Sequence, residues 1–135
     1  MPVFAATDYF VSINGTTFST ALNSVELAEE ADNLETTAFG STWRTRIGGL
    51  KQASLTLNFM QDFAAGSVDA TLNPLLGSIA TVVIKPTSGT VSSTNPTYTM
   101  QALVTQYSPF ASSVGDLATL SVTWPVNGTV TRATA

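Results

Sequence analysis

A strict alternation of apolar and polar side chains runs from Ser54 to Phe59, in a segment that ends at Met60, and it limits this chain to folds with a half-buried sheet. Leucine and phenylalanine occupy every second position, with serine, threonine and asparagine between them, so an extended segment has one apolar face. Residues 118–124 repeat the pattern and end at Trp124, which we assign to the core. Both polar faces lack lysine and glutamate, although solvated sheet faces use charge freely.

Turn signals divide the rest of the chain into further short strands. The pairs Asn14-Gly15 and Asn127-Gly128 predict tight turns, because asparagine and glycine tolerate positive φ. Together with the two alternating segments, the remaining strands give seven or eight in all, at the spacing of a β-sandwich. We expect these remaining strands at residues 8–13, 16–20, 25–31, 79–85, 97–107 and 129–133.

One short α-helix is expected at about residues 64–73. Apolar side chains recur there at i, i+4, i+8 and i+11 from Ala64, which places them in one stripe. Asp62 or Ser67 is a candidate N-cap. Pro74 ends the helix, because proline in a helix interior costs about 3 kcal/mol.

Composition indicates one domain, residues 1–135, and excludes several classes of protein. Charged residues make up only 10% of the chain and the net charge is −4, so there is no basic face for nucleic acid. No run of apolar residues is long enough for a transmembrane helix. Cysteine and histidine are absent, which excludes disulfides, thiolate nucleophiles and imidazole catalysis. We therefore expect no enzyme activity, no metal and no cofactor.

The stretch from Asn33 to Lys51 holds three of the five basic residues and one of the two tryptophans. We expect a long loop at about 32–50, with a helical turn near 37–40. Its aromatic residues lie among short polar ones, so they pack either in the chain's own core or against another subunit. Interfaces favour aromatics and arginine, which makes the candidate assembly residues Phe39, Trp43, Arg44 and Arg46.

A cluster of carboxylates precedes and enters this stretch. Its spacing does not match a calcium loop, and neighbouring carboxylates do not span a sugar cleft. We interpret it as a solvated or channel-facing acidic strip. Arg44 and Arg46 are its candidate ion-pair partners, in surface bridges worth under about 1 kcal/mol or in buried subunit contacts that set register. The strip consists of Glu26, Glu29, Glu30, Asp32 and Glu35.

The segment from Glu35 to Lys51, followed by Ser54–Leu57, resembles the tail tube proteins of long-tailed bacteriophages, especially those of actinobacteria. Residues 62–77 and 114–125 are similar to the same family, so the resemblance covers about Val25 to the C-terminus. Asn73 departs from it, because the family has an aromatic at this place.

The resemblance implies a mainly β, tail-tube-type sandwich or barrel with one flanking helix. Subunits of this family form hexameric rings that stack into a tube, inner strands join into one barrel around a lumen, and a long loop or hairpin reaches the adjacent ring. DNA passes without specific binding and no membrane is involved. Implied partners are the tail terminator, tape measure and distal tail proteins, and the implied location is the virion tail, with assembly in host cytoplasm. A non-contractile tail is favoured.

Two other readings are compatible with the sequence. The first is a different phage structural component, either a capsid decoration protein or a baseplate ring subunit, which shares the sandwich and the low charge. The second is a surface- or carbohydrate-binding β-sandwich module, which would need a row of exposed aromatics. Polymerisation separates the first from a tube protein, and glycan binding separates the second.

Overall fold

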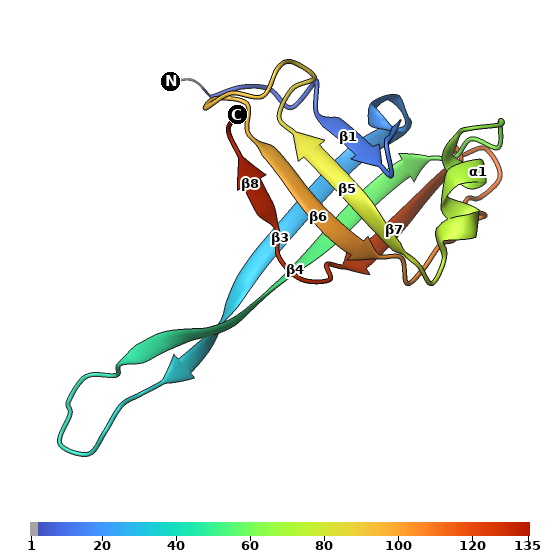
Figure 1. The fold of residues 1–135 in the computed structure, drawn as a ribbon. Coiled ribbons are helices and arrows are strands. Elements are labelled where there is room, and N and C mark those ends of the chain that lie inside the picture. The colour runs from blue at the N-terminus through green and yellow to red at the C-terminus, as the bar shows by residue number, and fades with distance from the viewer. Residues whose placement is uncertain (1–2) are drawn as a thin grey trace.

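The computed structural model describes residues 3–135, and within them eight strands form two antiparallel sheets beside one short helix (Figure 1). This confirms the predicted mainly β fold. Sheet A has the order β2-β1-β5-β6-β8. Its strands are β1 (Phe10–Ile13), β2 (Thr16–Thr17), β5 (Ile79–Lys85), β6 (Thr97–Leu103) and β8 (Thr131–Ala133). Sheet B has the order β3-β4-β7. Its strands are β3 (Leu22–Glu35), β4 (Arg46–Met60) and β7 (Thr119–Pro125).

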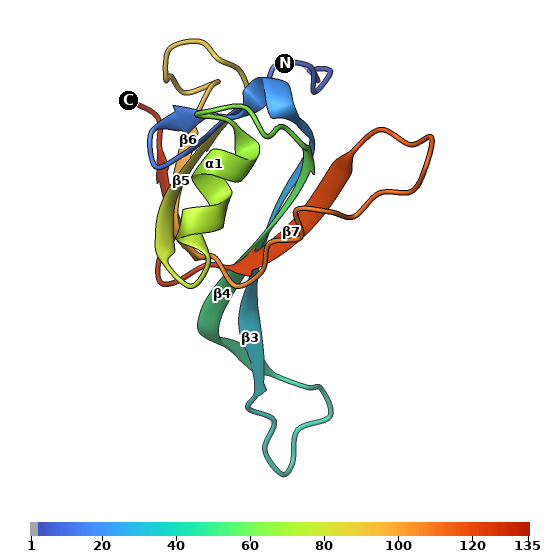
Figure 2. The same ribbon diagram turned by 90° about the vertical axis from the view of Figure 1, so that its right-hand side faces the viewer.

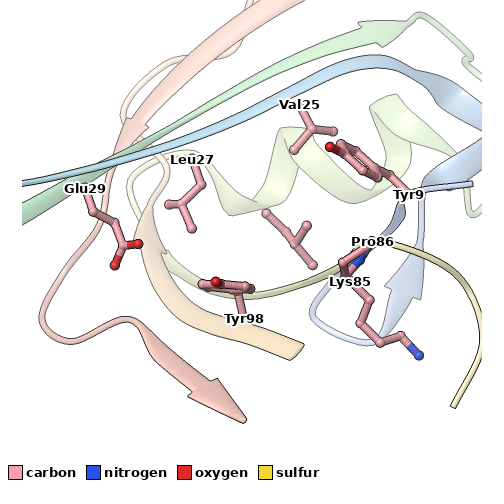
Figure 3. A pocket seen from close by; sticks show the side chains of 8 residues that line it. Tyr9, Val25, Leu27, Glu29, Lys85, Pro86 and Tyr98 are labelled. Atoms are coloured by element: carbon pink, nitrogen blue, oxygen red, sulfur yellow. The ribbon is translucent and has the colours of Figure 1, made fainter. Parts of the chain in front are cut away.

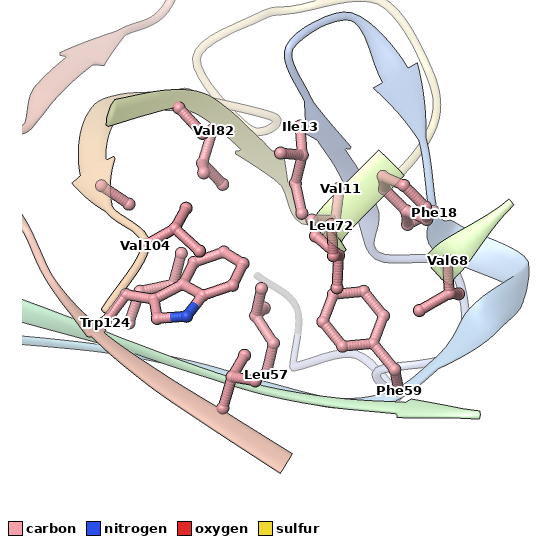
Figure 4. Close-up of a cluster of buried hydrophobic side chains, with 14 of the residues drawn as sticks. Val11, Ile13, Phe18, Leu57, Phe59, Val68, Leu72, Val82, Val104 and Trp124 are labelled. Carbon is pink, nitrogen blue, oxygen red and sulfur yellow. The ribbon is translucent and has the colours of Figure 1, made fainter. Parts of the chain in front are cut away.

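The core lies between the two sheets and is closed at one end by α1 (Figures 2 and 4). Alternate residues of β4 and β7 supply one wall, as the two alternating segments predict. Trp124 is fully buried, and its indole N–H donates a hydrogen bond to the carbonyl of Gln106 at 3.0 Å. Phe18 and Phe59 meet edge to face with ring centroids 5.8 Å apart. The prediction that Trp124 is a core residue is confirmed.

The two Asn-Gly pairs behave differently. Asn14 and Gly15 both have positive φ, 50° and 85°, as a type I′ hairpin turn between β1 and β2 requires. In the second pair only Gly128 has positive φ. The chain there crosses from β7 in sheet B to β8 in sheet A, which pairs with β6. The last strand therefore begins at Thr131, two residues later than predicted.

The helix is shorter than the predicted residues 64–73. It consists of α1 (Val68–Leu72), which is followed directly by the 3₁₀ turn η2 (Asn73–Leu75). A separate 3₁₀ turn, η1 (Ser19–Ala21), lies between β2 and β3. Gly66 has φ of +77°, which an α-helix excludes. The Asp62 carboxylate instead holds a turn, because it accepts hydrogen bonds from the Ala64 N–H at 2.9 Å and the Ser67 hydroxyl at 2.8 Å.

The loop predicted at 32–50 is shorter in the structure, because residues 32–35 and 46–50 belong to the paired strands of a β-hairpin. Strands β3 and β4 remain paired out to Glu35 and Arg46, and only residues 36–45 connect them. The ladder continues beyond the strands, where the Thr36 N–H donates to the Thr45 carbonyl at 2.7 Å. No helical turn forms at 37–40, where Gly40 has φ of +91°. We call residues 31–51 the arm, which projects well beyond the sandwich (Figures 1 and 2).

Candidate assembly surfaces

The tip of the arm, residues 36–45, presents its aromatic side chains to solvent. Phe39 is fully exposed and Trp43 is 83% exposed. Each lies in the connection between β3 and β4, beyond the reach of the sandwich core (Figure 1). Of the two interpretations of these aromatics, packing in the chain's own core is therefore wrong. The contact with another subunit stays a prediction.

The two arginines of the candidate interface differ in their partners. Arg44 forms an ion pair with Glu35 at 2.7 Å, with side chains 69% and 48% exposed. Such an exposed pair is worth under about 1 kcal/mol. Arg46 lies opposite Glu35 in the strand ladder, and its guanidinium has no carboxylate within salt-bridge distance among residues 3–135. The charge of Arg46 is thus available to a partner.

The arm also exposes aliphatic side chains along its length. Leu34 and Ile47 lie opposite each other in the ladder, and Leu50 follows on β4. All three are about half or more exposed. A solvated hairpin would normally carry polar residues at such positions, so this surface is suited to burial by a partner.

The predicted acidic strip lies along one strand but divides between its two faces. Glu26 and Glu30 share the outer face of sheet B with Thr56 and Gln52 across the ladder. Glu29 lies on the opposite face, in the same row as Leu27, and borders the gap between the sheets (Figure 3). The remaining members are in the arm. The five carboxylates therefore do not lie together on one face of the sheet.

The outer face of sheet B is broad, polar and free of basic side chains. Glu30 accepts a hydrogen bond from Gln52, Asn58 donates to Asn23 at 2.6 Å, and Thr56 bonds Thr123 at 3.3 Å. Its charged members are the two carboxylates named above. The residues of this face are Ser24, Glu26, Ala28, Glu30, Gln52, Ser54, Thr56, Asn58, Ser121 and Thr123, with Met60, Thr119 and Pro125 at its end.

Both edges of sheet B lack a strand neighbour within the described part of the chain. The edge of β3 is 14 residues long. The edge of β7 is covered only by side chains: the Gln106 amide donates to the Thr123 carbonyl at 2.9 Å, and the Ser112 hydroxyl accepts from the Thr119 N–H at 3.1 Å. Long open edges invite pairing with another chain.

A second aromatic surface, not singled out from the sequence, lies at the other end of sheet B. Phe63 and Phe110 stack with ring centroids 5.4 Å apart and an interplanar angle of 26°. Their side chains are 55% and 84% exposed. The sequence signal for this surface is the same as for Phe39 and Trp43, namely large aromatics in loops of small polar residues. It was missed because Phe63 and Phe110 are 47 residues apart in the sequence.

Comparison with solved structures shows what this arrangement is. A chain in the virion of a native gene transfer agent particle superposes with a TM-score of 0.77, covering 97% of this chain and 99% of that one at 15% identity. A chain in the tail of an empty gene transfer agent particle, refined with C6 symmetry, gives 0.68, with 90% and 88% covered at 19% identity. This chain therefore shares its fold with chains of gene transfer agent particles, one of them a chain of the tail. No family model and no curated protein matches its sequence.

This shared fold agrees with the resemblance to tail tube proteins. The structure neighbours are a virion and a tail particle. The narrower expectation of an actinobacterial phage stays a prediction.

A cavity of about 270 Å³ opens between the two sheets and is lined by Tyr9, Val25, Leu27, Glu29, Ile84, Lys85, Pro86 and Tyr98 (Figure 3). The Lys85 ammonium donates to the Gly89 carbonyl at 3.0 Å and lies over the Phe10 ring. Within residues 3–135 no three Cys, His, Asp or Glu side chains gather as metal ligands. No helix in that range has the length and apolar character to span a membrane.

Proposed function

We propose that this chain is the subunit of a phage tail tube, in which hexameric rings stack into a conduit for DNA. The observation that carries the proposal is the fold shared with a chain of a C6-symmetric gene transfer agent tail. The role is structural rather than catalytic, and its location is the virion tail after assembly in the host cytoplasm. Tail terminator, tape measure and distal tail proteins are the expected neighbours at the tube ends.

Sheet B is the part of the molecule suited to line the lumen. Strands β3 and β7 form its two edges, and each is antiparallel to β4, so they run in the same direction. In a ring of identical subunits, β3 of one copy would lie beside β7 of the next. The side-chain bonds that cover the β7 edge would then give way to backbone pairing. Closure into a barrel removes both open edges.

The outer face of sheet B would then be the lumen wall. Its hydroxyl and amide groups, with carboxylates at Glu26 and Glu30, offer DNA phosphates no cation. Because each lysine or arginine contact with a phosphate adds affinity through counterion release, a wall without them lets DNA pass.

The arm would make the contact between successive rings. The four candidate assembly residues lie in its tip (Phe39, Trp43 and Arg44) or directly after it (Arg46), all exposed in the single chain. We expect the double variant Trp43→Ala, Arg46→Ala to remain a folded monomer that does not form tubes. Unimpaired tube assembly by this variant would refute the role of the tip.

The first test of the tube itself is negative-stain electron microscopy of the purified protein, with light scattering of the same sample. We expect hollow tubes with six-fold end views. Closed rings that do not stack would instead favour a baseplate ring or decoration protein. A persistent monomer that binds glycans on an array would favour the carbohydrate-binding module.

The lumen assignment has a matched test. Ser121→Lys places a cation on the outer face of sheet B, whereas Ser93→Lys makes the same change in the exposed loop between β5 and β6. We expect tubes of Ser121→Lys to retain short DNA at low salt and to release it at high salt. Tubes of Ser93→Lys should retain none. Equal retention by the two variants would show that sheet B does not face the lumen.

A further inference from the structure

The stacked pair Phe63 and Phe110, here called the aromatic patch, lies at the opposite end of sheet B from the arm tip. Phe63 follows the end of β4 by three residues, whereas the tip immediately precedes its start. At about 3.3 Å per residue, the 15 residues of β4 span roughly 50 Å. The tip and the patch of one molecule therefore cannot meet, and Figure 1 shows the β3–β4 connection and the loop that follows β4 at opposite ends of the molecule.

The patch is a built surface rather than two isolated side chains. The rings stack on each other, and the loop that carries Phe110 also exposes Val114 and Leu117. Gln61 holds this loop to the end of β4, because its amide donates to the Pro109 carbonyl at 2.9 Å and to the Tyr107 hydroxyl at 3.2 Å. A positioned pair of exposed aromatics is typical of the centre of an interface.

The two ends of the molecule carry opposite charge. Around the patch, residues 61–78 and 104–118 contain Asp62, Asp69 and Asp116 and no lysine or arginine. The Asp116 carboxylate accepts no hydrogen bond from residues 3–135. Arg44 in the tip is paired with Glu35, while Arg46, directly after the tip, has no such partner in the described chain. The unpaired positive charge of Arg46 beside the tip complements an acidic patch.

We propose that the aromatic patch is the docking site for the arm tip of another copy of this chain, with Phe39 and Trp43 against Phe63 and Phe110, and Arg46 facing Asp116. This deepens the proposed tube function, on which it rests, by naming the acceptor surface for the arm. The tip and the patch are different surfaces, so every docked copy still has one of each exposed. Such a heterologous contact propagates instead of closing as a dimer.

The absence of cysteine makes a direct test available, because engineered thiols are the only ones present. One variant carries Thr42→Cys at the tip, and a second carries Ala111→Cys beside Phe110; both positions are exposed. Mixed at assembling concentration with oxidised glutathione, they should give disulfide-linked dimers that a reductant dissolves. Neither variant alone should dimerise.

A matched control replaces Ala111→Cys by Thr90→Cys, which is exposed in the loop between β5 and β6. The tip variant should not cross-link to this position. Tip-to-tip dimers, or equal cross-linking to residues 90 and 111, would overturn the docking proposal.

Assembly supplies an independent readout. We expect Phe110→Ser to raise the concentration needed for tube formation by about tenfold or more, as loss of an interface hot spot does. Phe4→Ser, an exposed aromatic elsewhere in the chain, should leave it unchanged. Arg46→Asp should weaken assembly, and combination with Asp116→Arg should restore it.

The outcomes separate this inference from the tube function. Tubes that form without the tip-to-patch disulfide, and that tolerate Phe110→Ser, would overturn the docking site and leave the tube intact. A tip-to-patch disulfide without tubes would support the docking site and count against the tube. Absence of both would overturn both.

Discussion

The two halves of β4 belong to one strand and pair with the same neighbour, β3, yet they differ in burial. Residues 54–60 alternate between fully buried and partly covered side chains, because sheet A and α1 lie over one face. Residues 46–53 are almost entirely exposed, because no second layer covers them. In the sandwich without the arm, here called the body, burial of one face fixes the register of the strands. In the arm, only the backbone ladder and a few cross-strand pairs do so.

This contrast separates the part of β4 that stabilises the fold from the part that would make contacts in the proposed tube. A two-stranded hairpin with no layer against it is marginally stable in water, so the arm draws its order from its continuity with the sandwich. Its exposed aliphatic and aromatic side chains bury little surface in the free subunit, and in the proposed tube a partner would cover them. Variants in the two halves should therefore affect different measurements.

The largest expected effect is on the body. Trp124→Ala should lower the free energy of unfolding by about 3–5 kcal/mol, because it leaves a cavity in the core and an unpaired Gln106 carbonyl. Urea denaturation of the monomer measures it. Trp43→Ala, the same substitution at the exposed tip, should stay within about 0.5 kcal/mol of the original chain. Similar losses in the two variants would abolish the distinction between body and arm.

The next effect is confined to the arm. A Cβ added at Gly49 would lie 3.0 Å from the Asp32 Cβ and 3.1 Å from a Leu34 methyl carbon, whereas one at Gly48 meets nothing within 4 Å. Gly49→Val should distort the arm at a cost of about 1–3 kcal/mol and accelerate hydrogen exchange of arm amides. Gly48→Val is the matched control. Unchanged exchange in Gly49→Val would show that the arm adapts freely.

A smaller effect concerns the base of the sandwich and depends on pH. The Tyr107 hydroxyl donates to Asp69 at 2.6 Å, so Tyr107→Phe should cost about 0.5–1.5 kcal/mol near neutral pH. Burial, and then the bond to Asp69, raise the pKa of Tyr107 above its ordinary value near 10.

The sign of this pH dependence follows from linkage. Because folding favours the neutral phenol, its contribution is fully present below pH 10 and is lost as the pH rises through the folded-state pKa. The stability difference between the original chain and Tyr107→Phe should therefore be constant below pH 10 and shrink above it. A difference that grows at alkaline pH would contradict the assignment.

The smallest effect is that of the ion pair at the tip. Arg44→Ala should change monomer stability by no more than a few tenths of a kcal/mol, because both partners are solvated. Thermal unfolding at low and high salt measures it. A loss above about 1 kcal/mol would mean that the tip supports the fold of the free subunit.

The sequence predicted the body better than the arm for a physical reason. The alternation that begins at Ser54 indicates a strand buried on one face, and the Asn14-Gly15 pair indicates a tight turn. Each of these features depends on one short segment, so each could be predicted from that segment alone. The arm is held by pairing between β3 and β4, and neither strand there has an alternating pattern because neither face is covered. Its residues consequently read as a loop.

The candidate site divides in the same way. Phe39 and Trp43 stood out because they lie close together in a polar stretch. Phe63 and Phe110 become neighbours only when the loops after β4 and β6 fold together. The extent of the helix was misjudged because an apolar stripe records which residues face the core, while Gly66 and the Asp62 turn decide where helical hydrogen bonding starts.

The register shift between Ala31 and Asn33, where the β3–β4 ladder is interrupted, gives the arm a point of bending. β-bulges increase local twist and bend the strand that carries them. At about 3.3 Å per residue the tip lies roughly 20 Å beyond this point, so a rotation of about 10° would displace it by roughly 3–4 Å. In the proposed tube, bending of the arms at this point would let neighbouring rings tilt relative to each other where the tube curves, while each tip stays bound to its aromatic patch. A long tail would then bend at the arms between its rings, while the β-barrel wall within each ring keeps its shape.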